Sequence, residues 1–146
     1  MGYRSDVRII TSKEGFEKLK EFVAEYLKEH NEDYNLLEEC DIKKEGKNQC
    51  YLGWDSIKWY EDSFDDVDAI MNGLRSLSEN EYSFRYMRIG ENYDDIEEEC
   101  FDGEKDNGFD VEYPNMIREF DDEYVVSLIS ENKSQELEEN KDEVDI

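Results

Sequence analysis

The densest group of chemically active side chains is a run of carboxylates in the second half of the chain. Acids take five of the six positions from 94 to 99, and three more follow by position 106. The eight residues are Asp94, Asp95, Glu97, Glu98, Glu99, Asp102, Glu104 and Asp106. Such a run can be a solvated loop, a surface complementary to a basic groove on a partner, or a site for a hard divalent cation.

The metal interpretation fails the one loop pattern that could be recognised. Counting an EF-hand from Asp102, Asn107 stands where the turn glycine belongs and Tyr113 where the bidentate glutamate belongs. We therefore expect no bound metal and no other cofactor. Carboxylates on a rigid edge can instead occupy the positions of phosphates and make bidentate contacts with arginine. We predict that the eight acids bind a partner.

The other reactive side chains favour structural roles. His30, the one histidine, is predicted at the end of a helix, where a cation suits the helix dipole. The three cysteines, Cys40, Cys50 and Cys100, form no C-x-x-C pair, and we expect buried, reduced thiols. No phosphate-binding glycine loop, H-E-x-x-H or G-x-S-x-G motif is present. The chain is therefore predicted not to be an enzyme.

Aromatic and basic residues are expected to support the fold. Trp54, Trp59 and Tyr60 fit strand packing better than an exposed aromatic platform. Arg85 and Arg88 lie inside a predicted strand, where arginine is uncommon. We expect both arginines to pair with nearby acids and to hold the acidic run in place.

The net charge narrows the classes of partner. The chain has 146 residues, with 42 acids and 17 bases, a net charge of −25. Residues 1–90 hold 20 acids and 13 bases, which gives −7, whereas residues 91–146 hold 22 and 4, which gives −18. Direct binding to nucleic acid or to an anionic membrane needs the opposite sign of charge. A basic protein is the expected partner, and the oligomeric state is left open.

Hydrophobic periodicity predicts the elements that must position these residues. Apolar residues alternate in a strand at 3–9, and helical spacing follows a Thr11 cap that has Glu14 three residues later. A second helix is predicted after Ser63. The apolar phase slips near Asp55, which indicates a bulge, a short turn or burial of both faces. Further strands are predicted at 36–43, 49–60, 82–89, 109–113 and 124–129, with a polar loop at 102–108.

This order, β-α-β-β-α-β followed by one or two C-terminal strands, predicts an α+β fold. It is the ferredoxin-like split β-α-β order, with two helices on one face of an antiparallel sheet. We expect residues 1–130 to form a single acidic domain. Residues 131–146 are predicted to be an acidic, mobile tail.

Three patches of sequence resemble a family of small phage and prophage proteins. They are Met-Gly-Tyr-Arg-Ser-Asp-Val at 1–7, Ile-Lys-Trp-Tyr at 57–60, and Phe-Arg-Tyr-Met-Arg-Ile-Gly-Glu at 84–91 running into Asp-Asp-Ile-Glu at 94–97. The resemblance covers about residues 1–119. It implies no catalytic activity. It implies the context of mobile elements, where small acidic proteins block host defences such as CRISPR effectors.

These observations predict a phage-associated interaction protein that works in the host cytoplasm, since no signal peptide or apolar membrane span is found in the sequence. It would bind and inhibit a basic, nucleic-acid-handling host protein, in the manner of an anti-CRISPR or other anti-defence protein, by imitating nucleic-acid charge. One alternative is a metal-dependent hydrolase or phosphoesterase that uses the carboxylates after residue 93. Another is an accessory phage protein with no inhibitory role.

Overall fold

The computed structural model describes residues 2–60, 63–106 and 120–130. Along the chain these form β1 (Ser5–Ser12), α1 (Lys13–Glu29), the 3-10 helix η1 (Leu36–Glu38), β2 (Ile42–Glu45), β3 (Gln49–Ile57), α2 (Asp65–Glu79), β4 (Phe84–Gly90), β5 (Ile96–Phe101) and α3 (Asp122–Ser130). The predicted strand at 109–113 and the tail at 131–146 lie outside the described residues. Within the described part, no helix is both long enough and apolar enough to cross a membrane.

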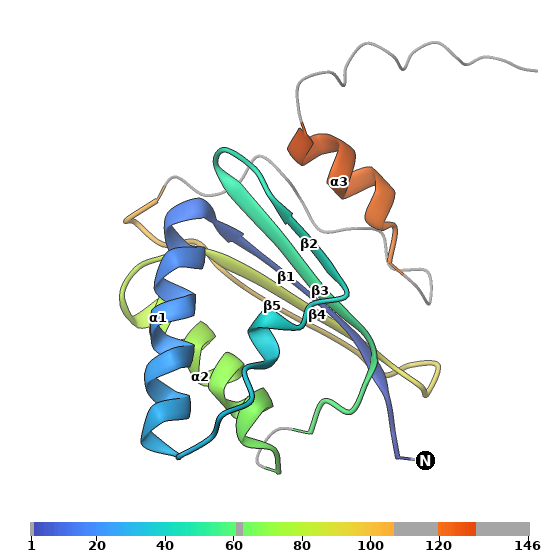
Figure 1. The fold of residues 1–146 in the computed structure, drawn as a ribbon. Coiled ribbons are helices and arrows are strands. Elements are labelled where there is room, and N and C mark those ends of the chain that lie inside the picture. Colours follow the sequence, from blue (N-terminus) through green and yellow to red (C-terminus); the bar gives the residue numbers. More distant parts are fainter. Residues whose placement is uncertain (1, 61–62, 107–119, 131–146) are drawn as a thin grey trace, which may run out of the picture.

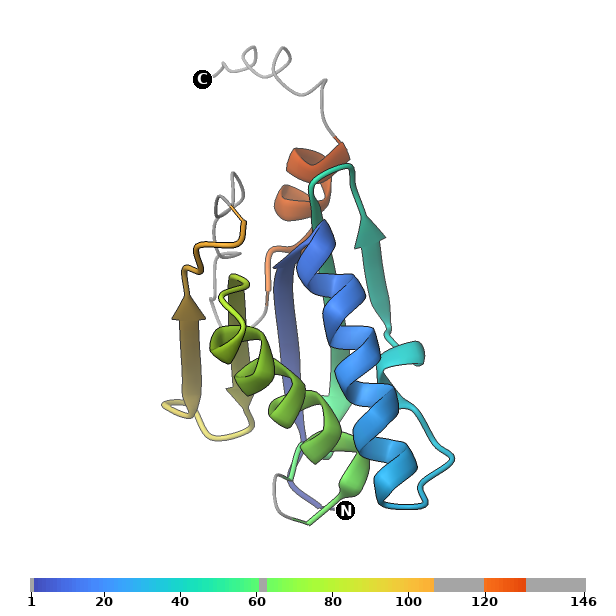
Figure 2. The ribbon, with the colours of Figure 1, turned by 90° about the vertical axis from the view of Figure 1, so that its left-hand side faces the viewer.

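The strands form one antiparallel sheet in the order β2-β3-β1-β4-β5. Helices α1 and α2 cover one face, and α3 lies against the opposite face (Figures 1 and 2). The α+β class and the two helices on one face are therefore confirmed. The strand order is compatible with the ferredoxin-like split, and β5 is the one added strand in the described part.

One predicted strand is wrong, and another begins later than predicted. Residues 124–129 lie in helix α3, where Val125 is buried and Ile129, four residues on, packs against the same cluster, so the short apolar run has a helical period. In the predicted strand at 36–43, Leu36 and Leu37 are both buried in the 3-10 helix η1, which Asn35 caps by accepting a hydrogen bond from the Leu37 N–H. The strand β2 begins only at Ile42.

The helices begin at other residues than the capping patterns predict. The Oγ of Ser12, rather than Thr11, caps α1 by accepting from the Gly15 N–H at 2.9 Å, because β1 continues through Thr11. Helix α2 has Phe64 at its N-cap without a side-chain cap, so the Ser63 prediction is also wrong. The predicted apolar residues of α2 are nevertheless buried: Val67, Ile70, Met71, Leu74 and Leu77.

Burial of both sheet faces explains why the alternation of β1 and β3 is incomplete. Ile9 packs with α1 and α2, whereas the adjacent Ile10 packs with Phe120 and Val125 on the α3 side. The phase slip in β3 is a bulge as well, since Val7 pairs with Trp54 while Ser5 pairs with Ile57. Ser56, within the bulge, has a φ of 53°.

A buried arginine holds α3 to the sheet. The side chain of Arg8 is 3% exposed; its Nε and Nη2 donate to the two carboxylate oxygens of Asp122 at 2.8 and 2.9 Å. Nη2 also donates to Asp55 at 2.8 Å, and the guanidinium lies 4.7 Å from the Phe120 ring centroid. A Cβ on Gly53, which faces Arg8 across the strands, would collide with the arginine side chain.

The charges in this cluster shift one another's ionisation. Burial alone would lower the pKa of Arg8, but its bonds to Asp122 and Asp55 outweigh burial and raise it. Burial would raise the pKa of Asp122, but the bonds that it accepts from Arg8 and the Tyr51 hydroxyl lower it overall. Both groups are therefore charged at neutral pH, and each needs the other.

The substitution Asp122→Asn tests this cluster. It leaves a buried guanidinium with one carboxylate instead of two, and we expect a loss of about 3 kcal/mol in the free energy of unfolding. Chemical denaturation measures the loss. The matched control is Glu123→Gln, which removes a charge from the exposed neighbouring residue and should change stability by less than about 0.5 kcal/mol. Equal stabilities of the two variants would contradict the assignment.

Stability should also fall with acid through Asp122. Its pKa in the folded protein is below the ordinary value, so its contribution is full above about pH 5 and is lost as the pH falls below about 4. We expect the stability difference between the wild type and Asp122→Asn to shrink over that interval. Denaturation measured at steps from pH 6 to pH 3 checks it; a constant difference would contradict it.

Candidate functional site

The acidic run forms the edge strand of the sheet rather than a loop. We call the eight predicted residues, Asp94 to Asp106, the acidic edge. Strand β5 pairs with β4 along its whole length, from Ile89 opposite Ile96 to Phe84 opposite Phe101. Asp94 and Asp95 lie in the turn before β5, and Asp102, Glu104 and Asp106 follow its other end. The structure therefore spreads the eight acids along the strand and its two flanking turns.

Strand alternation divides the central acids between two faces. Glu97 and Glu99 pair with Arg88 and Tyr86, and Tyr86 belongs to the core under α1 and α2. Glu98 pairs with Met87, which belongs to the core on the α3 side. The three glutamates are exposed. They thus present two short rows of charge along one edge.

Arg88 fixes the turn that leads into β5. Its guanidinium binds both carboxylate oxygens of Asp95, at 2.7 and 3.1 Å, and Glu97 at 2.8 Å. Burial would lower the pKa of Arg88, but these two carboxylates raise it overall. Tyr3 also donates to Asp95, at 2.6 Å, and Gly90 allows the close approach, since a Cβ there would collide with that carboxylate. The expected pairing of Arg88 with local acids is confirmed.

The far end of the acidic edge is fixed in the same way. Arg85 donates to Asp102 at 3.1 Å, as expected. Asp106 accepts from the hydroxyls of Ser12 and Ser83, at 2.6 and 2.7 Å, and from the Ser83 N–H. Because Ser12 is also the cap of α1, Asp106 ties the loop after β5 to the start of that helix. Asp106 thus has a structural role.

A large surplus of negative charge is left after this pairing. Residues 91–106 contain nine acids and one base, a net charge of −8, and adding Arg85 and Arg88 gives −6. In the part of the chain that the structure describes, no ion pair forms to Asp94, Glu98 or Glu104. The internal arginines therefore position the acidic edge without neutralising it.

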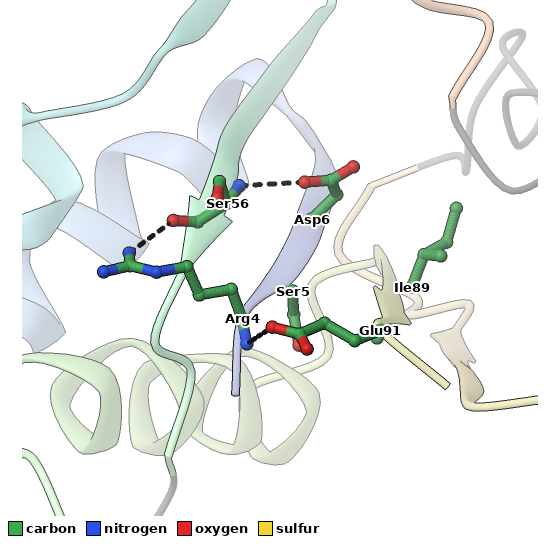
Figure 3. Close-up of a pocket in the computed structure, with 7 residues that line it drawn as sticks. Arg4, Ser5, Asp6, Ser56, Ile89 and Glu91 are labelled. Carbon is green, nitrogen blue, oxygen red and sulfur yellow. Dashed lines mark hydrogen bonds between the residues drawn. The ribbon is translucent and has the colours of Figure 1, made fainter. Parts of the chain in front are cut away.

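A small pocket that the sequence did not indicate lies beside the turn between β4 and β5. It has a volume of about 200 Å³ and is lined by Arg4, Ser5, Asp6, Ser56, Ile89, Gly90 and Glu91 (Figure 3). The Arg4 N–H donates to Glu91, the Arg4 guanidinium donates to the Ser56 carbonyl, and the Ser56 N–H donates to Asp6. These polar groups bind one another, and their hydrogen bonds hold the N-terminal segment against the bulge of β3 and the turn between β4 and β5.

The other candidate residues have structural surroundings, with one exception. Trp54 and Trp59 are buried in the core, and His30 is the C-cap residue of α1, stacked on Tyr26. Burial raises the pKa of Cys40 and Cys50 to about 11, which makes both poor nucleophiles at neutral pH. Cys100 is exposed, so the prediction that it is buried is wrong. It lies on β5, whose outer side pairs with no other strand of the described residues.

No set of described residues is arranged to hold a metal. Groups of three or more histidine, cysteine, aspartate or glutamate side chains with suitable geometry do not occur among them. The strand separates Glu98 from Glu97 and Glu99, and Arg88 occupies Asp95 and Glu97. The carboxylates are therefore arranged as a charged surface rather than as a coordination shell.

Comparisons of the chain with protein-family models, with curated proteins and with solved structures find no match. The geometry of the acidic edge is consequently the basis for assigning a function.

Replacing Arg88 tests whether it positions the acidic edge. In Arg88→Gln, Asp95 and Glu97 repel each other without a cation between them. Since these carboxylates are 29% and 48% exposed, solvent reduces the effect, and we expect a loss of about 1–2 kcal/mol in the free energy of unfolding. Amide hydrogen exchange should also become faster in residues 91–97.

The matched control is Arg75→Gln, which removes the same charge from an exposed position on α2. It should leave both the stability and the exchange rates of residues 91–97 near those of the wild type. Slow exchange in that segment of Arg88→Gln would show that β4 pairing alone holds the turn.

Proposed function

We propose that this protein binds a basic, nucleic-acid-handling protein through its acidic edge and thereby blocks that protein's access to nucleic acid. The observation that carries the proposal is the net charge of −6 on residues 91–106 together with Arg85 and Arg88. These residues form β5 and its flanking turns, whose position is fixed by β4 and the two arginines. A fixed array of charges loses little conformational entropy on binding, in contrast to acids on a flexible chain.

The spacing of the array supports charge mimicry. Consecutive residues of an extended strand repeat at roughly 3.3 Å. The phosphates of one DNA strand repeat at about 3.4 Å along the helix axis. Glu97, Glu98 and Glu99 are consecutive in β5 and exposed, so their backbone positions follow this axial repeat while their carboxylates alternate between the two faces. A groove lined by arginine and lysine would accept such an array.

The resemblance of residues 1–7, 57–60 and 84–97 to phage and prophage proteins suggests the class of target. A phage protein made in the cytoplasm of its host meets CRISPR effectors and other defence nucleases, which hold nucleic acid in basic channels. Occupation of such a channel would inhibit the effector without catalysis or a cofactor. The proposal therefore assigns binding, and no reaction, to the acidic edge.

Affinity capture from host lysate tests the proposal. The immobilised protein is incubated at about 50 mM salt and eluted with a rising gradient, and eluted proteins are identified. We expect a basic nucleic-acid-binding protein that elutes as salt screens the charges. Its purified form should bind duplex or guide nucleic acid less well when this protein is present. Capture that resists salt, or no competition with nucleic acid, would contradict the proposal.

A charge-reversal variant locates the binding surface. Asp94→Lys, Glu98→Lys and Glu104→Lys together spare Asp95, Glu97, Asp102 and Asp106, which the fold uses. We expect at least tenfold weaker binding to the captured partner, equivalent to about 1.4 kcal/mol or more, as measured by calorimetry.

The control carries the same change of charge elsewhere, as Glu25→Lys, Glu29→Lys and Asp33→Lys at exposed positions on α1 and the following loop. It should bind within about threefold of the wild type. Equal weakening by both variants would show that overall charge, rather than the acidic edge, determines binding.

A further inference from the structure

Within residues 2–60, 63–106 and 120–130, the outer edge of β5 has backbone groups that no neighbouring strand binds. Strand β5 is last in the sheet order, and no strand among the described residues pairs with its outer side. The Gly90 N–H donates to the Asp95 carbonyl at 2.8 Å, which makes residues 90 and 95 a hydrogen-bonded pair. Because such pairs alternate in an antiparallel ladder, Glu97, Glu99 and Phe101 direct their backbone groups toward β4. The N–H and C=O groups of Glu98 and Cys100 therefore point outward.

Charge decides which kind of strand can pair with this edge. In a second copy of the chain, β5 would bring its own glutamates opposite Glu97, Glu98 and Glu99, and like charges directly across a strand pair are destabilising. A lysine- or arginine-rich strand would instead place cations opposite these glutamates on both faces. The −6 surplus makes that pairing favourable before any backbone bond forms.

Exposed apolar side chains lie at the turn end of the same edge. Ile96, on β5, is 43% exposed, and Tyr93, in the preceding turn, is 82% exposed. They would contact the end of an added strand, where a partner's apolar residue could cover them. The edge thus offers backbone groups, flanking charges and a small apolar end.

We propose that the acidic edge binds an extended, lysine- and arginine-rich segment of its partner as a sixth strand, hydrogen-bonded to the backbone of Glu98 and Cys100. This rests on the proposed function and specifies how its charges are used. In this mode the backbone bonds supply affinity and direction, whereas the glutamates on the two faces select a basic sequence.

Two peptides of identical sequence and charge separate strand addition from simple charge attraction. The probe is a ten-residue peptide that repeats Lys-Lys-Thr-Thr, which places lysines on both faces of an extended strand. Its counterpart is N-methylated at four consecutive central amides, which removes donors from both of its edges. At about 50 mM salt we expect the unmodified peptide to bind at least tenfold more tightly by calorimetry. It should also slow amide hydrogen exchange at Glu98 and Cys100.

The substitution Cys100→Pro tests the protein's side of the same bonds. It removes an outward N–H, changes no charge, and leaves the ladder to β4 intact, since proline is tolerated on an edge strand when its missing N–H faces solvent. We expect at least tenfold weaker binding of the unmodified peptide. The control Cys100→Ala keeps the N–H and should bind as the wild type does. Thermal unfolding shows whether the proline variant is folded.

The outcomes separate this inference from the proposed function. Equal affinity for the two peptides overturns strand addition, and so does a failure of both peptides to bind at low salt. Both measurements use the wild-type protein. They therefore test the inference even if Cys100→Pro does not fold. The proposed function stands or falls separately, on whether the Asp94, Glu98 and Glu104 reversal weakens binding of the captured partner.

Discussion

A single buried cation, Arg8, determines how the two sides of this sheet are completed. A guanidinium inside an apolar layer is unfavourable unless carboxylates surround it. Asp55 comes from the bulge of β3, and Asp122 from the first turn of α3. The bulge and the third helix are thus required by the same charge. Around them, Ile10, Tyr51, Met87 and Phe120 complete a second core.

Arginine–carboxylate pairs also form at β5, the edge strand, but there they leave a net negative charge on the surface. Arg88 and Arg85 also bind carboxylates, but their side chains are 15% and 17% exposed, whereas that of Arg8 is 3% exposed. At Arg8 the ion pairs join α3 and the bulge of β3 to β1. At β5 the arginines set the positions of acids whose surplus charge faces solvent. The three arginines Arg8, Arg85 and Arg88 thus lie where the backbone of the bulge, α3 or the ends of β5 is held in a defined position.

The sequence predicts the helix face and the central strands well, because their signals are local. Phe16, Leu19, Val23 and Leu27 recur at helical spacing, and all are buried on α1. The pairing of Arg85 and Arg88 with acids also follows from local composition.

Elements that depend on distant partners were not predictable. Strand β5 contains three successive glutamates, which have a low preference for strands, and it is extended because β4 supplies its hydrogen bonds. The alternation of β1 places Arg8 on the strand face that would be solvated if α3 did not cover it. A run such as residues 124–129 is too short to distinguish a helix from a strand by period alone.

The chain distance between Arg8 and Asp122 bears on how the protein is made. The two residues are 114 positions apart, and all five described strands precede Asp122, so during synthesis the sheet can assemble before this carboxylate emerges from the ribosome. In that interval one side of the nascent sheet lacks its helix, and its aliphatic residues are open to other chains. The guanidinium of Arg8 lies in the middle of that layer and binds water until α3 covers it. We expect this charge to oppose association of the uncovered layer with other chains until α3 packs against it.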